Sequence, residues 1–164
     1  MYYTCRESQE DNRLFTKNLK NMKKEEFLAM SLPFDLMIAE INDDGLIVRK
    51  SMLCPSRYHD FATHDYYKPY CRPLSDLTKP IEHNGEKFVP IDNIEGLFIE
   101  GTEDLINQSI EAIEYFIENN FFSRMEYLPF ILIQKLIEWH FDIAGLIEKG
   151  EAIDVNTLTE NPYK

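Results

Sequence analysis

Two stretches near the C-terminal end carry apolar residues at helical spacing, and this feature most limits what the chain can fold into. In the first stretch Thr102 is a typical N-cap residue, and Glu103 and Asp104 follow it in the first turn, where negative charge is favourable. The apolar residues of this stretch fall on one side of a helical wheel: Leu105, Ile106, Ile110, Ile113, Phe116 and Ile117. We therefore expect an amphipathic helix with an acidic outer face.

The second stretch predicts a longer helix, from Leu128 to about Glu148. Pro129 lies in its first turn, where a missing N–H costs nothing, and Gly150 follows its expected end. Its apolar residues cover a wide arc: Phe130, Ile133, Leu136, Ile137, Ile143 and Ile147. We expect this to be the most buried helix, and the two helices together to supply most of the core.

A β-hairpin is predicted over residues 36–50. Two short runs of β-branched and apolar residues flank the turn sequence Asn42-Asp43-Asp44-Gly45, which ends in a residue that tolerates positive φ. A second tight turn is indicated at 83–86, before a short strand-like run. Residues 54–73 hold aromatic residues and prolines without a clear period, so we expect a long loop there around at most one edge strand.

These patterns predict a single α+β domain over residues 1–164. We expect a small antiparallel sheet, built from the 36–50 hairpin and the 66–90 segment, packed against the two long C-terminal helices. An additional N-terminal helix is predicted over 16–30, because good helix formers precede a proline stop. Residues 1–15 and 157–164 are expected to be less ordered.

Negative charge is concentrated in the C-terminal half. Residues 1–82 hold 12 basic and 13 acidic side chains, whereas residues 83–164 hold 5 basic and 16 acidic ones. The formal net charge of the whole chain is −12. Direct binding to nucleic-acid phosphates or to an anionic membrane is therefore disfavoured. Between Lys87 and Arg124 there are eight carboxylates and no Lys, Arg or His.

The acidic face expected for the 102–118 helix is the candidate partner-binding site. Neighbouring carboxylates on a helix stand about 5–6 Å apart, which approaches the charge spacing of roughly 3.4 Å along a nucleic-acid strand. Such a row mimics a nucleic acid and can occupy a basic groove. The alternative is a solvated face that only keeps the protein soluble. The candidate residues are Glu103, Asp104, Glu111, Glu114 and Glu118.

A possible metal site lies in the loop expected at 54–73. His59-Asp60 and His64-Asp65 form a repeated pair at a spacing of five, flanked by Cys54 and Cys71. Imidazole, carboxylate and thiolate groups together can hold zinc or another divalent metal. The spacing matches no established finger or hydrolase pattern, however, and a solvated aromatic loop is the favoured interpretation.

His140 falls near the centre of the apolar arc of the 128–148 helix. A buried imidazole can act as a general base, but it is more often a core residue that bonds a carbonyl or carboxylate. No serine or cysteine lies in a nucleophile motif, and the six glycines form no phosphate-binding loop. We therefore assign no catalytic residue, no metal and no cofactor, and we favour a non-enzymatic protein.

The cysteines and the apolar runs predict a cytoplasmic protein. The chain has three cysteines, without CxxC spacing, and no basic leader with an apolar segment at its beginning. We therefore expect reduced thiols. The longest apolar run, 127–133, covers seven residues, whereas crossing a bilayer takes about 20.

Four sequence blocks resemble a group of small uncharacterised proteins encoded by phages and prophages of gut-type bacteria. The blocks are Arg72–Lys79, Gly85–Ile91, Leu136–Asp142 and the last block, Gly145–Gly150 with Ala152–Asp154, and they are preceded by Leu32-Pro33-Phe34. The chain departs from the group's pattern at Ala144, where the group has an aromatic residue, and at Glu151, where it has an apolar one. The resemblance covers roughly residues 32–155. The group has no assigned activity, so no residue inherits a role. The resemblance implies a phage-related setting inside a host cell.

The leading hypothesis is a non-enzymatic interaction protein that inhibits a basic, nucleic-acid-handling host protein. Small acidic phage proteins of this size include inhibitors of host nucleases, among them anti-CRISPR proteins, which is an analogy of size and charge. One alternative is a metal-dependent hydrolase that uses His59 and His64. Another is a structural or assembly protein of the phage. The sequence does not determine the oligomeric state.

Overall fold

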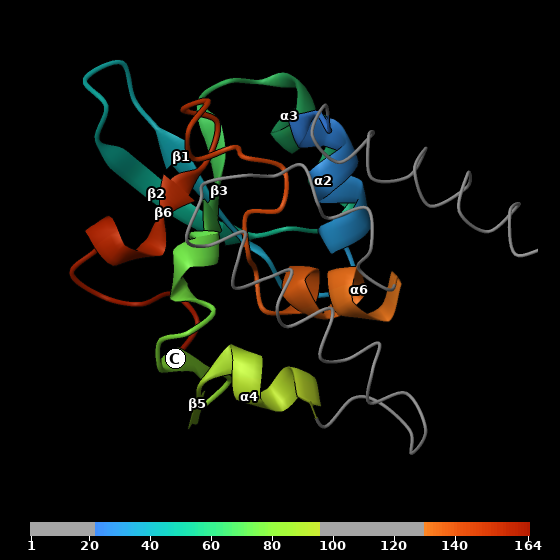
Figure 1. Ribbon diagram of the computed structural model, residues 1–164. Coiled ribbons are helices and arrows are strands. Elements are labelled where there is room, and N and C mark those ends of the chain that lie inside the picture. Colours follow the sequence, from blue (N-terminus) through green and yellow to red (C-terminus); the bar gives the residue numbers. More distant parts are fainter. Residues whose placement is uncertain (1–21, 96–129) are drawn as a thin grey trace, which may run out of the picture.

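The computed structural model describes residues 22–95 and 130–164. Ten helices and strands, with three short 3₁₀ turns between them, make up this part of the chain (Figure 1). In chain order they are α2 (Lys24–Ser31), β1 (Met37–Ile41), β2 (Ile47–Met52), α3 (Tyr58–Thr63), β3 (Tyr67–Cys71), β4 (Ile81–His83), β5 (Glu86–Phe88), α4 (Pro90–Glu95), α6 (Phe130–Glu138) and β6 (Ile153–Asp154).

The main sheet has four strands in the order β2-β1-β3-β6. β1 pairs antiparallel with both β2 and β3, but β6 pairs parallel with β3, joining Tyr70 to Ile153 and Cys71 to Asp154. The expected antiparallel sheet is therefore wrong in this respect. A strand of two residues is too short to show an alternation of apolar and polar side chains in the sequence. Its direction depends on the path of the chain after α6. β4 and β5 form a separate antiparallel pair.

Both predicted turns are confirmed. The 36–50 hairpin forms from β1 and β2, and Gly45 has a φ of 78° where the turn closes. The Asn42 carboxamide oxygen accepts a hydrogen bond from the Leu46 N–H at 2.8 Å. In the 83–86 turn, Asn84 and Gly85 both have positive φ, 53° and 80°. Two successive left-handed residues match the right-handed twist of the flanking strands.

The loop expected over 54–73 is instead largely structured. It contains a 3₁₀ turn, the six-residue helix α3 and the strand β3. α3 buries only Phe61 and Ala62, and the Phe61 ring packs edge-on against Tyr67 at 5.0 Å between centroids. A helix of fewer than two turns shows no 3.6-residue period, so tertiary packing forms an element that the sequence pattern does not reveal.

The prediction of two long C-terminal helices is wrong. α6 spans only nine residues and ends at Glu138, ten residues before the expected end, and no second long helix lies in the part of the chain that the structure describes. The 102–118 stretch falls outside the described residues. The N-terminal helix expected over 16–30 corresponds to α2, Lys24–Ser31, and residues 1–21 also fall outside them.

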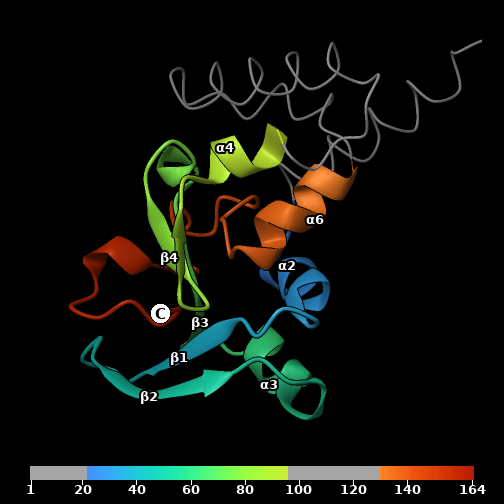
Figure 2. The same ribbon diagram turned by 90° about the horizontal axis from the view of Figure 1, so that it is seen from below.

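The described core lies between the sheet and the helices. In both views α2, α3 and α6 lie to the same side of the sheet (Figures 1 and 2). The largest fully buried side chains come from every layer: Phe27, Leu28, Leu36, Ile38, Phe61, Tyr70, Leu77, Ile94, Leu132, Ile133 and Phe141. The core of the described residues is therefore built by short elements, and α6 supplies nine residues of the helix expected over 128–148.

The segment 157–164, which we expected to be less ordered, carries a buried anchor. Tyr163 is 5% exposed, and its hydroxyl donates to the Tyr70 carbonyl at 2.7 Å. The same hydroxyl accepts from the Met37 N–H at 3.2 Å. The Tyr163 carbonyl accepts from the Asn84 N–H at 3.1 Å. One residue thus joins β1 and β3, through its side chain, and the β4–β5 hairpin, through its backbone, to the C-terminal segment.

Removing this hydroxyl is expected to destabilise the fold. Tyr163→Phe leaves the buried Tyr70 carbonyl and the part-buried Met37 N–H without their partner, at a cost of about 1–3 kcal/mol. Urea denaturation measures the change in the free energy of unfolding. Tyr66→Phe is the matched control, because the Tyr66 side chain is 43% exposed. Equal midpoints for the two variants would contradict the anchoring role of Tyr163.

Candidate functional site

The end of α6 places a histidine in an unusual backbone conformation. His140 has a φ of 63°, in the left-handed region that favours glycine. Its N–H donates to the Ile137 carbonyl at 2.9 Å, and the Phe141 N–H donates to the Leu136 carbonyl at 2.9 Å. These are the two bonds of a Schellman motif, and the apolar residues Leu136 and Phe141 are both buried beside it. The motif is the physical reason why the helix stops here.

Buried hydrogen bonds of Arg72 connect the elements that form this site. It is 3% exposed, its Nε donates to the Trp139 carbonyl at 3.1 Å, and its Nη2 donates to the Glu82 carbonyl at 2.8 Å. The backbone of Arg72 also bonds that of His140 and Asp142, at 2.8 and 2.9 Å. This guanidinium therefore caps α6 and fixes β4, which carries His83, against it.

Three aromatic rings meet beside Arg72. The His140 ring lies 4.0 Å from the Tyr163 ring and 5.2 Å from the His83 ring, measured between centroids. His140 is 1% exposed and His83 is 9% exposed. The Nδ1 atoms of both imidazoles are buried and have no hydrogen-bond partner within the described chain. Buried polar atoms of this kind normally have a partner, so the pair needs an explanation.

Burial keeps both imidazoles uncharged at neutral pH. Desolvation, with smaller contributions from His83 and Arg72, lowers the pKa of His140 to about 3. Desolvation and Arg72 also lower the pKa of His83. Burial raises the pKa of Tyr163 well above its usual value. At pH 7 these groups offer neutral hydrogen-bond donors and acceptors, and His140 is too weak a base to collect protons.

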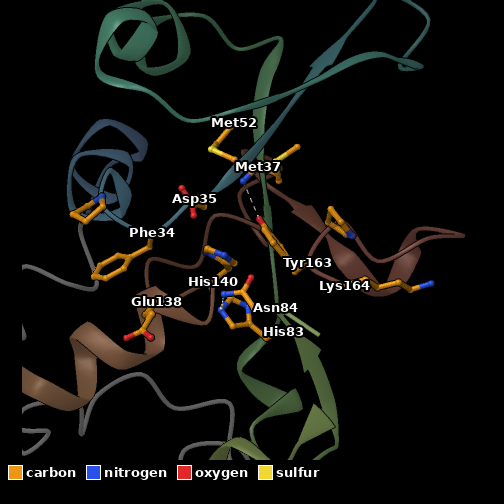
Figure 3. A pocket seen from close by; sticks show the side chains of 12 residues that line it. Phe34, Asp35, Met37, Met52, His83, Asn84, Glu138, His140, Tyr163 and Lys164 are labelled. Carbon is orange, nitrogen blue, oxygen red and sulfur yellow. Dashed lines mark hydrogen bonds between the residues drawn. The ribbon is translucent and has the colours of Figure 1, made fainter. Parts of the chain in front are cut away.

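The two histidines line a cavity of about 510 Å³ (Figure 3). Its apolar lining comes from Pro33, Phe34, Met37, Met52 and Pro162, and its polar lining includes Asp35, Asn84, Glu138 and Lys164. The three non-glycine residues with positive φ in the described chain, Asp35, Asn84 and His140, all line this cavity. Such conformations cost energy and cluster at functional sites, which makes this cavity the candidate site.

Sequence reasoning located only part of this site. His140 is buried as expected, but it follows α6 and does not lie within a helix, and its Nδ1 lacks the expected carbonyl or carboxylate partner. Asp142 is also buried, and its carboxylate accepts from the N–H groups of Leu146 and Ile147, both at 2.8 Å. Sequence reasoning missed His83, Arg72 and Tyr163, because no local pattern marks residues brought together across 90 positions.

The predicted metal-ligating residues do not come together. His59 and His64 are exposed on α3 and just after it, and the His64 Nδ1 lies 3.0 Å from the Asp60 carbonyl oxygen. No three His, Cys, Asp or Glu side chains are placed to hold a metal ion within residues 22–95 and 130–164. Cys54 and Cys71 are free thiols. Burial raises the pKa of the Cys71 thiol well above its usual value.

The predicted partner-binding residues, Glu103, Asp104, Glu111, Glu114 and Glu118, fall outside the described residues. Asp92, an earlier member of the same acidic run, lies on α4 and is exposed. Among the described helices, none has the length and apolar character needed to cross a membrane.

Comparison with known proteins gives no relative. No protein-family model, no curated protein and no solved structure matches this chain.

The histidine pair is expected to make stability depend on pH. The pKa of His140 is about 3 in the folded chain and about 6.5 when unfolded. Between these pH values the unfolded chain binds a proton that the folded chain does not. The free energy of unfolding therefore falls as the pH drops below about 6.5, by up to about 1.4 kcal/mol per pH unit for one histidine.

Urea denaturation between pH 4 and 8 measures this slope. His140→Asn removes the imidazole and keeps a residue that tolerates positive φ, so its slope is expected to be shallower. His59→Asn removes an exposed imidazole and is expected to retain the slope of the unmodified chain. If all three proteins lose stability in parallel on acidification, the buried histidine is not the cause.

Proposed function

We propose that this protein is a non-enzymatic, acidic interaction protein that inhibits a basic, nucleic-acid-handling host protein, for example as an anti-CRISPR or another inhibitor of host defence. The observation that carries the proposal is the run between Lys87 and Arg124, which holds eight carboxylates without a single Lys, Arg or His. The contacts assigned to the partner are Glu103, Asp104, Glu111, Glu114 and Glu118.

The described residues in the first part of this acidic run and just after its end support the proposal. On the N-terminal side, Ile94 of α4 is fully buried while Asp92 is exposed. On the C-terminal side, Leu132 and Ile133 of α6 are fully buried. Buried residues of the folded body therefore lie in the first part of the run and shortly after its end.

Long-range electrostatics favour a basic partner. A net charge of −12 on 164 residues attracts a positively charged surface and speeds the encounter, and salt screens this attraction. The resemblance to phage and prophage proteins gives the proposal its setting, since a phage gains from blocking host enzymes that act on nucleic acids. A structural role in a phage particle would not require such a partner.

Reversing charge in the acidic run is expected to abolish partner binding. The test is affinity capture from a bacterial lysate with the full chain as bait, with the retained proteins identified by mass spectrometry. The expected partner is a basic nucleic-acid enzyme, retained in equal amount and released by added DNA or by salt. The triple variant Glu111→Lys, Glu114→Lys and Glu118→Lys is expected to lose it.

A matched control separates this site from general charge. Asp43→Lys, Asp44→Lys and Glu86→Lys change the net charge by the same amount at exposed turns of the two hairpins. This control is expected to keep most of the binding. Undiminished capture by the Glu111, Glu114 and Glu118 variant would overturn the proposal, as would a partner that handles no nucleic acid.

A further inference from the structure

We propose that the open edge of β2 binds an extended segment of a partner protein, which adds to the sheet as an antiparallel strand with an acidic side chain opposite Lys50. Within the described chain β2 pairs only with β1, and it lies at the edge of the sheet in both views (Figures 1 and 2). This inference does not rest on the proposed function, because it concerns a basic strand and an acidic segment.

Exposed apolar side chains gather at this edge. Five large apolar side chains are exposed in the part of the chain that the structure describes, and four of them belong to β2 or to the residue before it. These four are Leu46, Ile47, Val48 and Met52, with exposed fractions of 38–64%. An edge strand with exposed apolar side chains is a template on which another strand can pair.

The pairing with β1 shows which backbone groups of β2 point outward. The Leu53 N–H donates to the Leu36 carbonyl at 2.7 Å. Hydrogen-bonded pairs alternate along an antiparallel ladder, so Ser51 is bonded to β1, whereas Lys50 and Met52 are not. The N–H and carbonyl groups of Lys50 and Met52 therefore face the open edge, where an added strand can bond to them.

The charge of β2 favours an acidic partner. The strand contains Arg49 and Lys50 and no acidic residue, and neither cation forms an ion pair within the described residues. Glu40 on β1 lies opposite Arg49. Lys50 instead lies opposite Ala39, which lies opposite Lys68 on β3, so the two lysines share one face of the sheet. A carboxylate opposite Lys50 on the added strand is therefore attracted at short range.

A second copy of this chain fits the same edge poorly. Two antiparallel copies of β2 are related by a two-fold axis perpendicular to the sheet, and the two longest overlaps place either Arg49 or Lys50 opposite itself. Like charges in directly opposite positions are destabilising. β2 also bulges at Val48, which has no partner on β1, and bulges protect edge strands from pairing with copies of themselves. The edge therefore favours a strand of opposite charge.

Met52 determines a second side chain of the segment. Directly opposite side chains point to the same face of a sheet. A residue opposite Met52 thus lies on the face where Met37 and Met52 line the cavity with Phe34 (Figure 3). An apolar side chain is favoured there. In the N-to-C direction of an antiparallel segment, the apolar residue opposite Met52 comes two positions before the acidic residue opposite Lys50.

The test uses the ¹⁵N-labelled full chain and the peptide Ser-Ile-Thr-Glu-Thr-Val. Hydrogen exchange measured by NMR is expected to slow at the Lys50 and Met52 amides on addition of the peptide, because both N–H groups gain carbonyl partners. The Ser51 amide, which already bonds to β1, is expected to change little. A peptide with lysine in place of glutamate is expected to bind roughly two- to tenfold more weakly.

Variants locate the binding and test its charge preference. Lys50→Glu is expected to reverse the preference, so that the lysine peptide binds more tightly than the glutamate peptide. Lys87→Glu makes the same change at an exposed position of β5 and is expected to keep the original preference. Methylating the backbone nitrogens of isoleucine and glutamate in the peptide removes the donors that face β2 and is expected to abolish binding. Methylating the threonine between them is expected to preserve it.

Three results would overturn the inference. The first is unchanged exchange at Lys50 and Met52 with millimolar peptide, and the second is equal binding of the two peptides to the unmodified chain. The third is protection of these amides without peptide that is lost on dilution, because a second copy would then occupy the edge. None of these measurements involves the residues assigned to the basic partner, so this inference and the proposed function fail separately.

Discussion

The described fold depends on the buried cation Arg72, which forms no ion pair within the described chain. Arg72 is 3% exposed, and its side chain bonds only backbone carbonyls, those of Trp139 and Glu82. Burying a charge is costly unless its hydrogen bonds are satisfied. A carbonyl at the C-terminal end of a helix is a favourable acceptor for a cation. Arg72 therefore stabilises the fold only when α6, β3 and β4 are all in place, which ties together elements far apart in the sequence.

The difference between local and long-range contacts explains which parts of the fold the sequence could predict. The turns at 42–45 and 83–86 were predictable because each depends on neighbouring residues that accept positive φ. The end of α6 was not, because the Schellman motif has histidine where glycine is the usual signal, and the apolar spacing continues beyond it. β6 was also missed, since a parallel strand of two residues is specified by its partner β3 and has no pattern of its own.

In the candidate site, too, local features were predictable and contacts between distant residues were not. The burial of His140 followed from its place among apolar residues, and the structure agrees. Its neighbours could not be predicted, because His83 and Tyr163 come from a hairpin and from the C-terminal segment, and only the complete fold brings them together. For the acidic residues between Lys87 and Arg124 the pattern in the sequence is clear. Their spacing is plain in the sequence, whereas the structure describes only the residues on either side of them.

The backbone strain in the described chain is concentrated around one polar cavity. Each of Asp35, Asn84 and His140 adopts a conformation that costs an ordinary residue energy, and all three line one cavity. Glycine at position 140 would relieve the backbone, but it would also remove the imidazole that stacks on Tyr163 and one of the two unpartnered nitrogens. A residue selected only for stability would not combine strain with an unsatisfied polar atom. That combination shows that the end of α6 is not optimised for stability alone.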